Sequence, residues 1–140
     1  MHDLIILGIL QEAELHGYEL KQRADKLMAG FYEVSYGSLY PNFKKLEKND
    51  LISSKSTFTE GGQEKISYKC TDKGIKEFLA KVATIPKESF QMSWVRFQIK
   101  VLFFNSVDNG TRFKLIDHME GLIQQELDKL KAALESPHLD

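Results

Sequence analysis

The sequence predicts a mainly α-helical protein with one small β-hairpin, arranged as a winged helix-turn-helix head followed by a two-helix arm. Three apolar segments with helical spacing precede residue 50, and an alternating ribbon with a Gly61-Gly62 tip follows them. Two longer amphipathic segments then lie between residues 86 and 136. The order helix, helix, helix, strand, strand is that of a winged helix. With 140 residues, of which 42% are hydrophobic, the chain can form a small core and an arm.

The first two predicted helices should form the core of the head. Asp3 can cap a helix that runs to about Glu12 and is apolar nearly all round, so this helix should be buried on more than one side. A buried strand is the alternative. His16-Gly17 breaks the chain, and a second helix then ends at Gly30. Its inward stripe at helical spacing is Leu20, Ala24, Leu27 and Met28.

The third predicted helix carries a possible DNA-reading surface. It starts near Ser35 or Ser38, and Ser38 is the preferred cap because it leaves Pro41 in the first turn, where a missing N–H costs little. The inward positions are Leu39, Phe43 and Leu46. The opposite arc holds Lys44, Lys45 and Lys48, with Ser38 at its edge and Tyr40 on the flank.

A hairpin is predicted from residues 51–59 and 65–71, with Gly61-Gly62 in the turn. In its second strand Ile66, Tyr68 and Cys70 alternate with Ser67, Lys69 and Thr71, which predicts one apolar face. Thr71 can cap a fourth helix. The inward stripe of that helix is Ile75, Phe78, Leu79 and Val82.

Thr84-Ile85-Pro86 is the predicted boundary between a DNA-binding domain (1–83) and a helical dimerisation domain (84–140). The first arm helix has a heptad-like seam of Phe90, Trp94, Phe97, Val101 and Phe104. After a break at residues 108–110, Thr111 can cap a second helix with the stripe Phe113, Ile116, Ile123, Leu127, Leu130 and Leu134. This is more apolar surface than the head can cover, so a two-fold homodimer through residues 86–136 is expected.

Composition limits the possible functions. The net charge is −1, but eight lysines against five acidic residues between Ser35 and Lys76 leave a local surplus of three positive charges, which permits DNA binding. Cys70 is the only cysteine and no apolar run is long enough for a membrane, so a cytoplasmic protein is expected. Scattered histidines predict no metal site, and we expect no cofactor. No nucleophile lies near a base at a recognisable spacing, and neither a phosphate loop nor a carboxylate pair occurs, so an enzyme is not expected.

A series of short motifs resembles the PadR-like transcriptional regulators. They are His16-Gly17-Tyr18-Glu19-Leu20, Gly37-Ser38-Leu39-Tyr40-Pro41, Leu46-Glu47, Leu51-Ile52, Gly61-Gly62, Tyr68, and Thr71 with Gly74. The resemblance implies a homodimeric repressor whose helices after the wing swap across the dimer. The sequence departs from the family pattern at Asp50, where glycine is usual. It departs again at Gln63-Glu64-Lys65-Ile66, where adjacent Arg or Lys is common.

These observations give three sets of candidate residues. For contact with a palindromic DNA operator they are Tyr18, Ser38, Tyr40, Lys44, Lys45, Lys48, Gly61, Gly62 and Lys65. Some regulators of the family bind flat aromatic compounds between subunits, so Phe90, Trp94 and Phe97 are candidates for an effector site. The candidate dimer residues are Phe90, Trp94, Phe97, Val101, Phe104, Ile123, Leu127 and Leu130.

Each set has a simpler interpretation. The lysines can be a solvated helix face, Ser38 only a cap, Tyr40 a side chain packed on the wing, and Trp94 ordinary dimer core. Two other functions therefore stay open. One is a winged-helix module that binds proteins, and the other is a small-molecule sensor that does not bind DNA.

Overall fold

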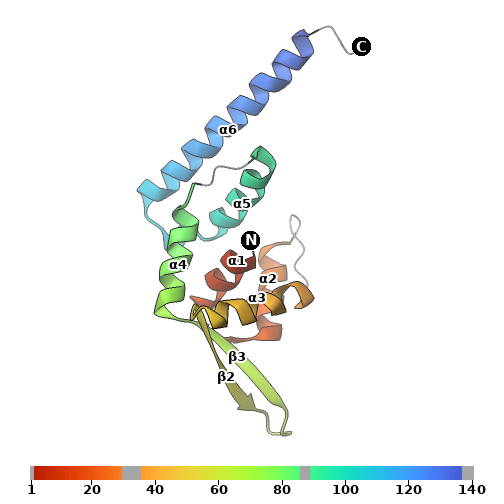
Figure 1. The fold of residues 1–140 in the computed structure, drawn as a ribbon, viewed down its shortest axis with the longest axis vertical. Coiled ribbons are helices and arrows are strands. Elements are labelled where there is room, and N and C mark those ends of the chain that lie inside the picture. The colour runs from red at the N-terminus through yellow and green to blue at the C-terminus, as the bar shows by residue number, and fades with distance from the viewer. Residues whose placement is uncertain (1, 30–35, 86–88, 137–140) are drawn as a thin grey trace. The chain divides into compact units, whose positions relative to one another are not determined.

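The computed structural model describes residues 2–29, 36–85 and 89–136 and divides the chain into two compact units, residues 1–82 and 83–140 (Figure 1). The first unit contains α1 (His2–Leu10), β1 (Leu15–His16), α2 (Gly17–Leu27), α3 (Tyr36–Lys48), β2 (Ile52–Phe58), β3 (Glu64–Cys70) and most of α4 (Asp72–Ala83). The second contains α5 (Phe90–Leu102), the short 3₁₀ helix η1 (Phe104–Ser106) and α6 (Asn109–Glu135). The first unit is thus a winged helix, and the chain is mainly helical, as the sequence predicts.

Helix α1 lies at the centre of the first unit. All seven residues from Leu4 to Leu10 are buried, so the prediction of a helix buried on more than one side is confirmed and the alternative of a strand is wrong. The helix already starts at His2. Asp3 is therefore not its cap but a residue of its first turn.

Helix α2 packs through Leu20, Ala24 and Met28, none of which is exposed to solvent. The expectation for Leu27 is wrong, since 38% of this residue is exposed. The buried arc centres on Ala24, so Leu27 lies at its edge in the last turn. Met28 ends the helix with its N–H bonded to the carbonyl of Ala24. The expected end at Gly30 lies outside the described residues.

Helix α3 buries the three predicted positions Leu39, Phe43 and Leu46 almost completely. Its start differs from the prediction. The helix begins at Tyr36, so Ser38 lies within the first turn instead of capping it, and Ser35 lies outside the described residues. Pro41 is consequently inside the helix. The helix gives up one backbone hydrogen bond there, a cost that its buried side chains offset.

The end of α3 takes the form of a Schellman motif. The N–H of Leu51 bonds to the carbonyl of Leu46, and the N–H of Asp50 bonds to that of Glu47. This geometry gives Asp50 a φ of 58°, in the left-handed region that favours glycine. The departure from the family pattern at this position therefore puts a side chain where the backbone is strained.

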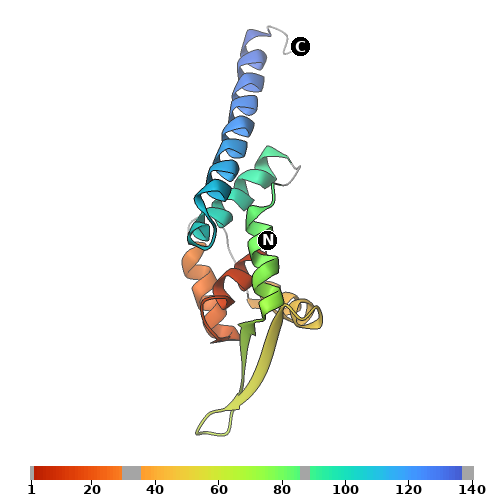
Figure 2. The same ribbon diagram turned by 90° about the vertical axis from the view of Figure 1, so that its left-hand side faces the viewer.

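The sheet has three antiparallel strands in the order β1-β3-β2, one more than the predicted hairpin. Strand β1 pairs Leu15 with Tyr68 and His16 with Ser67. It was missed because two residues are too few to show an alternating pattern. The outer part of the ribbon extends beyond the helices of the first unit (Figure 2).

The clean alternation predicted for β3 is also wrong. Ser67 and Tyr68 are both buried near the base of the ribbon, while Ile66 is 42% exposed further out. Ser67 pairs with His16 of β1, and its hydroxyl donates to Oε1 of Glu14 at 2.8 Å. The outer half of the ribbon does not pair with β1, and most of its residues on both faces are exposed.

Helix α4 follows β3 with the predicted cap. The hydroxyl oxygen of Thr71 accepts the N–H of Gly74 at 3.0 Å. Phe78 and Val82 are fully buried as expected, and Ile75 is half-buried. The prediction that Leu79 points inward is wrong, since this residue is 36% exposed at the edge of the buried stripe.

In the second unit, two local predictions change. Phe104 does not belong to α5, because the chain turns at Phe103 and Phe104 begins the 3₁₀ helix. The cap of α6 is Asp108, not Thr111: the Asp108 carboxylate accepts the N–H of Thr111 at 2.7 Å. That hydrogen bond also lowers the pKa of Asp108.

Helix α6 is 27 residues long, against 13 in α5, and only its first part is covered. Leu115 and Met119 are its buried residues. Most of the predicted stripe is exposed instead, namely Phe113, Ile116, Leu127, Leu130 and Leu134. Among the described helices, none has the length and apolar character needed to cross a membrane.

Candidate nucleic-acid interface

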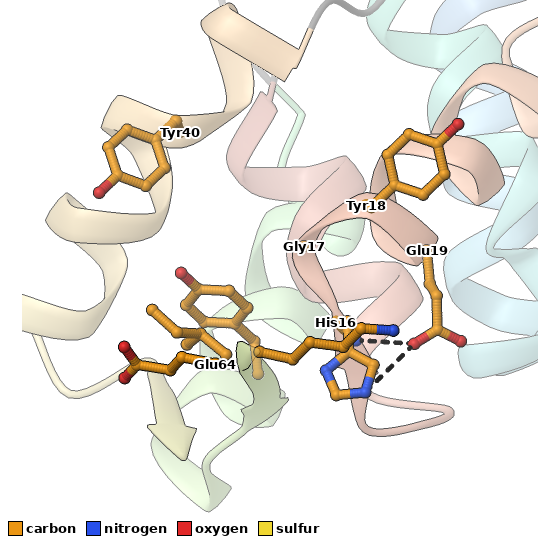
Figure 3. A pocket seen from close by; sticks show the side chains of 9 residues that line it. His16, Gly17, Tyr18, Glu19, Tyr40 and Glu64 are labelled. Carbon is orange, nitrogen blue, oxygen red and sulfur yellow. Dashed lines mark hydrogen bonds and ion pairs between the residues drawn. The ribbon is translucent and has the colours of Figure 1, made fainter. Parts of the chain in front are cut away.

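The first unit has an open pocket of about 350 Å³ between the start of α2, one flank of α3 and strand β3 (Figure 3). It is lined by His16, Gly17, Tyr18, Glu19, Tyr40, Glu64, Lys65, Ile66 and Tyr68. Three of the predicted DNA-binding residues, Tyr18, Tyr40 and Lys65, therefore share one concave surface. A volume of this size is that of a typical ligand cleft.

The start of α2 is held by a local contact. The Glu19 carboxylate accepts the backbone N–H of His16 at 3.1 Å and lies 3.8 Å from Nε2 of the same residue. In a capping box, the side chain of the third helical residue accepts the backbone N–H of the cap residue, and the contact between Glu19 and His16 is this hydrogen bond. Nδ1 of His16 is buried and has no hydrogen-bond partner among the described residues.

Tyr18 and Tyr40 occupy different helices around this pocket, as Figure 3 shows. Tyr18 is 66% exposed and Tyr40 is 42% exposed. From the sequence, packing in the core and contact with the DNA backbone are equally open for Tyr18. The structure places this residue on the surface. Tyr40 carries a cation above its ring, since Nζ of Lys44 lies 5.0 Å from the ring centroid.

The cationic arc of α3 is exposed as expected. Lys44, Lys45 and Lys48 all face solvent, and Ser38 lies in the first turn of the same helix. Nζ of Lys45 is 3.7 Å from the carboxylate of Asp3. The Lys45 side chain remains 65% exposed in this ion pair, so it is available for another anion.

The two glycines of the ribbon tip have different roles. Gly62 has a φ of 78° and its N–H bonds to the carbonyl of Thr59 at 2.9 Å, so the turn requires it. Gly61 has room for a side chain, because a Cβ would meet only Oγ1 of Thr59 at 3.9 Å. Lys65 is exposed and follows Glu64, which accepts a hydrogen bond from Ser56 at 2.8 Å.

Several residues at this surface were not anticipated from the sequence. Glu19 and Glu64 bring negative charge to the pocket. Phe58, 73% exposed near the ribbon tip, is a large apolar side chain in solvent. His16 and Glu19 could have been found from their place before a helical stripe, but no sequence signal indicated that Phe58 is exposed.

The candidate residues of the arm form a row of rings. The centroid distances are 6.4 Å for Phe90–Trp94, 6.2 Å for Trp94–Phe97 and 6.3 Å for Phe97–Phe104. Trp94 and Val101 are each at least 40% exposed. On α6, Ile123 is half-buried while Leu127 and Leu130 are exposed. Within the described ranges, no group of His, Cys, Asp or Glu side chains could hold a metal ion.

Three helices, an antiparallel wing and a lysine-bearing third helix define a winged helix-turn-helix protein. The sequence matches the transcriptional regulator PadR-like family over residues 6–80, more than half of the chain. The chain therefore belongs to the PadR-like family, whose members are transcriptional regulators and not enzymes.

Known members of this family are similar in sequence and in structure. The negative transcriptional regulator PadR of Bacillus subtilis is 32% identical over 72 residues, which are 51% of this chain and 40% of that protein. The crystal structure of Bacillus subtilis PadR with operator DNA has a TM-score of 0.55 at 24% identity, covering 95% of this chain and 73% of that one. The smu.1604c protein of Streptococcus mutans gives a TM-score of 0.54 at 29% identity, with coverage of 95% and 73%. The matched segment spans 40% of Bacillus subtilis PadR and 30% of the transcriptional regulator YqjI of Escherichia coli, less than half the length of either relative.

Proposed function

We propose that this chain is a homodimeric regulator that binds double-stranded operator DNA through α3 and the wing. The observation that carries the proposal is the exposed arc of Lys44, Lys45 and Lys48 on α3, flanked by Tyr40 and the pocket. A helix fits the major groove of B-form DNA, and lysines on its outer side can neutralise the adjacent phosphates. Further contacts with the DNA backbone are proposed for Tyr18, Ser38, Lys65 and the Gly61-Gly62 tip.

The wing is the weaker part of this interface. Glu64 lies beside Lys65, so the charges of this segment partly cancel for a phosphate at a distance. We therefore assign most of the electrostatic affinity to α3. Each phosphate that a lysine neutralises should contribute a slope of about −0.9 to the dependence of log K on log salt concentration.

The second unit is proposed as the dimerisation domain, with the first, up to residue 83, as the DNA-binding domain. The support is the exposed apolar stripe of α6, in which Leu127 is 44% and Leu130 is 62% exposed in the single chain. A stripe of this length usually marks an interaction surface. A second copy offers the same stripe, so a two-fold dimer can bury both. Phe90, Trp94, Phe97, Val101, Phe104 and Ile123 are proposed to extend the interface.

Repression and release by an effector form the more specific part of the proposal. One relative is named a negative transcriptional regulator, which supports a repressor. Trp94, 40% exposed between Phe90 and Phe97, is the candidate platform for a planar aromatic effector. Such a ligand weakens DNA binding only if it binds more tightly to the dimer arrangement that cannot bind DNA than to the arrangement that can.

The test compares two charge-matched double variants by fluorescence anisotropy with an operator duplex at several salt concentrations. Lys44→Ala with Lys45→Ala should weaken binding to all duplexes and flatten the salt slope by up to about 2. Lys76→Ala with Lys129→Ala removes the same charge from α4 and α6 and should leave the slope unchanged. If both double variants gave the same slope of log K against log salt concentration, the lysines of α3 would be a solvated helix face. That result would favour a protein-binding module.

The dimer has its own test. Leu127→Glu with Leu130→Glu should convert the chain to a monomer in sedimentation equilibrium at micromolar concentration, because carboxylates cannot be buried unpaired. Lys131→Glu, an exposed position on the same helix, is the control and should remain dimeric. A wild-type monomer in this experiment would contradict the proposed dimer.

A further inference from the structure

The ribbon of β2 and β3 has a continuous row of side chains on one of its faces. Residues directly opposite each other in an antiparallel ribbon lie on the same face, and alternate pairs along the strands share that face. The pairs of this row are Ile52–Cys70, Ser54–Tyr68, Ser56–Ile66 and Phe58–Glu64. The row therefore runs from the core of the first unit to the tip of the ribbon, where it ends at Phe58.

Contacts at the inner end show that this face packs on α3. The ring centroid of Tyr68 lies 4.8 Å from that of Phe43 in α3. The hydroxyl of Ser54 donates to the carboxylate of Glu47 on the same helix. Ile66 then lines the pocket to which α3 also contributes. The row therefore continues the proposed DNA-binding surface of α3 outward along the ribbon.

The outer end of the row is apolar and open to solvent. Tyr68 is 6% exposed, Ile66 is 42% exposed and Phe58 is 73% exposed. Phe58 lies in β2, the outer strand of the sheet, and the ribbon extends here beyond the helices of the first unit (Figure 2). A single exposed apolar residue is ordinary, but two on one face that continues a binding surface indicate a contact with a partner.

The charge beside Phe58 indicates what kind of contact this is. Glu64 lies opposite Phe58, and its carboxylate accepts the hydroxyl of Ser56 at 2.8 Å. A carboxylate held in this position repels phosphate. The outer end of the row therefore offers DNA an apolar contact instead of an ionic one.

We propose that Phe58 contacts DNA by placing its ring in the minor groove beside the major-groove site of α3. The minor groove is about 6 Å wide, and proteins that bind there frequently insert apolar side chains between base steps. The inference rests on the proposed function, since it requires that α3 and the wing bind duplex DNA. It adds to that function a specificity-determining residue on the wing.

The consequence is a sequence preference that needs no hydrogen bond to a base. Opening a base step for an apolar ring costs least where stacking is weak, at pyrimidine–purine steps. An amino group on the floor of the minor groove, as in guanine, hinders the ring. Phe58 should therefore favour A·T pairs that contain a TA step in the sequence flanking the α3 site.

The experiment measures the affinity of the full chain for an operator duplex with A·T flanks. Replacing a flanking adenine by 2,6-diaminopurine adds an amino group to the minor groove and leaves the major-groove pattern unchanged. At the contacted step this should raise the Kd of the wild type about tenfold, or about 1.4 kcal/mol. Phe58→Ala should bind the unmodified duplex about tenfold more weakly and respond little to the added amino group.

Two controls separate the ring from other effects. Phe58→Leu keeps an apolar side chain and should retain most of the affinity and of the response to diaminopurine. A duplex with 7-deazaguanine under α3 changes only the major groove and should weaken the wild type and Phe58→Ala by the same factor. Because Phe58 is exposed, Phe58→Ala should unfold at the wild-type temperature.

Glu64 provides an independent measurement of how near this part of the ribbon comes to DNA. If Phe58 enters the minor groove, Glu64 lies in the field of the phosphates, so Glu64→Gln should strengthen binding at low salt. Glu135→Gln, at the end of α6, removes the same charge outside the first unit and should change the affinity less.

Three results would overturn the proposal. Phe58→Ala that binds as tightly as the wild type would assign the ring to another partner, such as a protein. A diaminopurine effect of equal size in both would show that Phe58 does not contact the minor groove. In either case the Lys44→Ala, Lys45→Ala variant would still bind DNA more weakly than the wild type, whereas a wild type that binds no duplex would refute the proposed function as well.

Discussion

Gly74 is the position at which the structure predicts the largest effect of a single methyl group. A Cβ on Gly74 would lie 1.9 Å from the carbonyl oxygen of Leu51 and 2.7 Å from Sγ of Cys70, whereas ordinary contact begins at 3.4 Å. The carbonyl of Leu51 accepts the N–H of Thr71 at 3.0 Å. It cannot retreat without breaking the bond that joins the end of α3 to the start of α4.

The size of the effect follows from two opposing contributions. Overpacking costs about 1–3 kcal/mol, and a clash with backbone belongs at the upper end of this range. Alanine recovers about 1 kcal/mol through its higher helix propensity. The net loss of unfolding free energy for Gly74→Ala is therefore about 2 kcal/mol. For a domain of this size, that lowers the unfolding temperature by about 8–16 °C.

Thermal unfolding followed by circular dichroism measures this change, with Gly37→Ala as the control. Gly37 lies in α3 of the same unit, and no described atom lies within 4 Å of the position of its Cβ. Gly37→Ala should unfold at or slightly above the wild-type temperature. If Gly74→Ala unfolded at the wild-type temperature too, the close approach of α4 to Leu51 would be refuted.

Three further predictions concern single residues. Asp50→Gly should raise the unfolding free energy in urea by up to about 1 kcal/mol by relieving the left-handed backbone, while Asp50→Ala should not, and equal stabilities would contradict the strained φ of 58°. Burial raises the pKa of Cys70 to about 11, so iodoacetamide should alkylate it much more slowly than free cysteine at pH 7, and fast labelling there would refute its burial. The pKa of Asp108 is lower in the folded chain than its ordinary 3.8, so its stabilising contribution is present above pH 3.8 and lost as the pH falls further. Asp108→Asn should reduce the acid sensitivity of unfolding in that window, and an unchanged pH profile would argue against the cap.

The fold could be predicted where apolar residues recur at helical spacing over several turns and are buried in the core. Leu39, Phe43 and Leu46 indicated the orientation of α3, and all three are buried. Strand β1 could not be predicted, because its two residues acquire a strand conformation only by pairing with β3. The same long-range contact buries Ser67 and breaks the alternation of that strand.

Helix starts were predicted less well because several nearby residues can cap. In α6, both Asp108 and Thr111 have suitable oxygens, and the structure shows that the Asp108 carboxylate reaches the N–H of Thr111. The spacing of apolar residues in α6 also does not indicate which part of this helix the shorter helix α5 covers. Leu115 and Met119 are buried for that reason, while Leu134 is 87% exposed.

The candidate interface could be predicted in part from composition and position. Lysine spacing on a helix whose inward face is known indicates an exposed cationic arc, and the exposure of Lys44, Lys45 and Lys48 confirms that geometry. The contribution of Glu19 and Glu64 to the pocket depends on how α2 and β3 come together, which no local pattern encodes.

The central claim, that the first unit binds operator DNA as one half of a symmetric dimer, is tested most directly by selecting bound duplexes from a random DNA pool. The account predicts an enriched palindrome whose half-sites lie about 34–36 Å apart, one turn of B-form DNA, or a multiple of that spacing. The Lys44→Ala, Lys45→Ala double variant should enrich the same motif with a much lower yield. A wild-type pool that contains no common motif, or a single motif without two-fold symmetry, would contradict the claim.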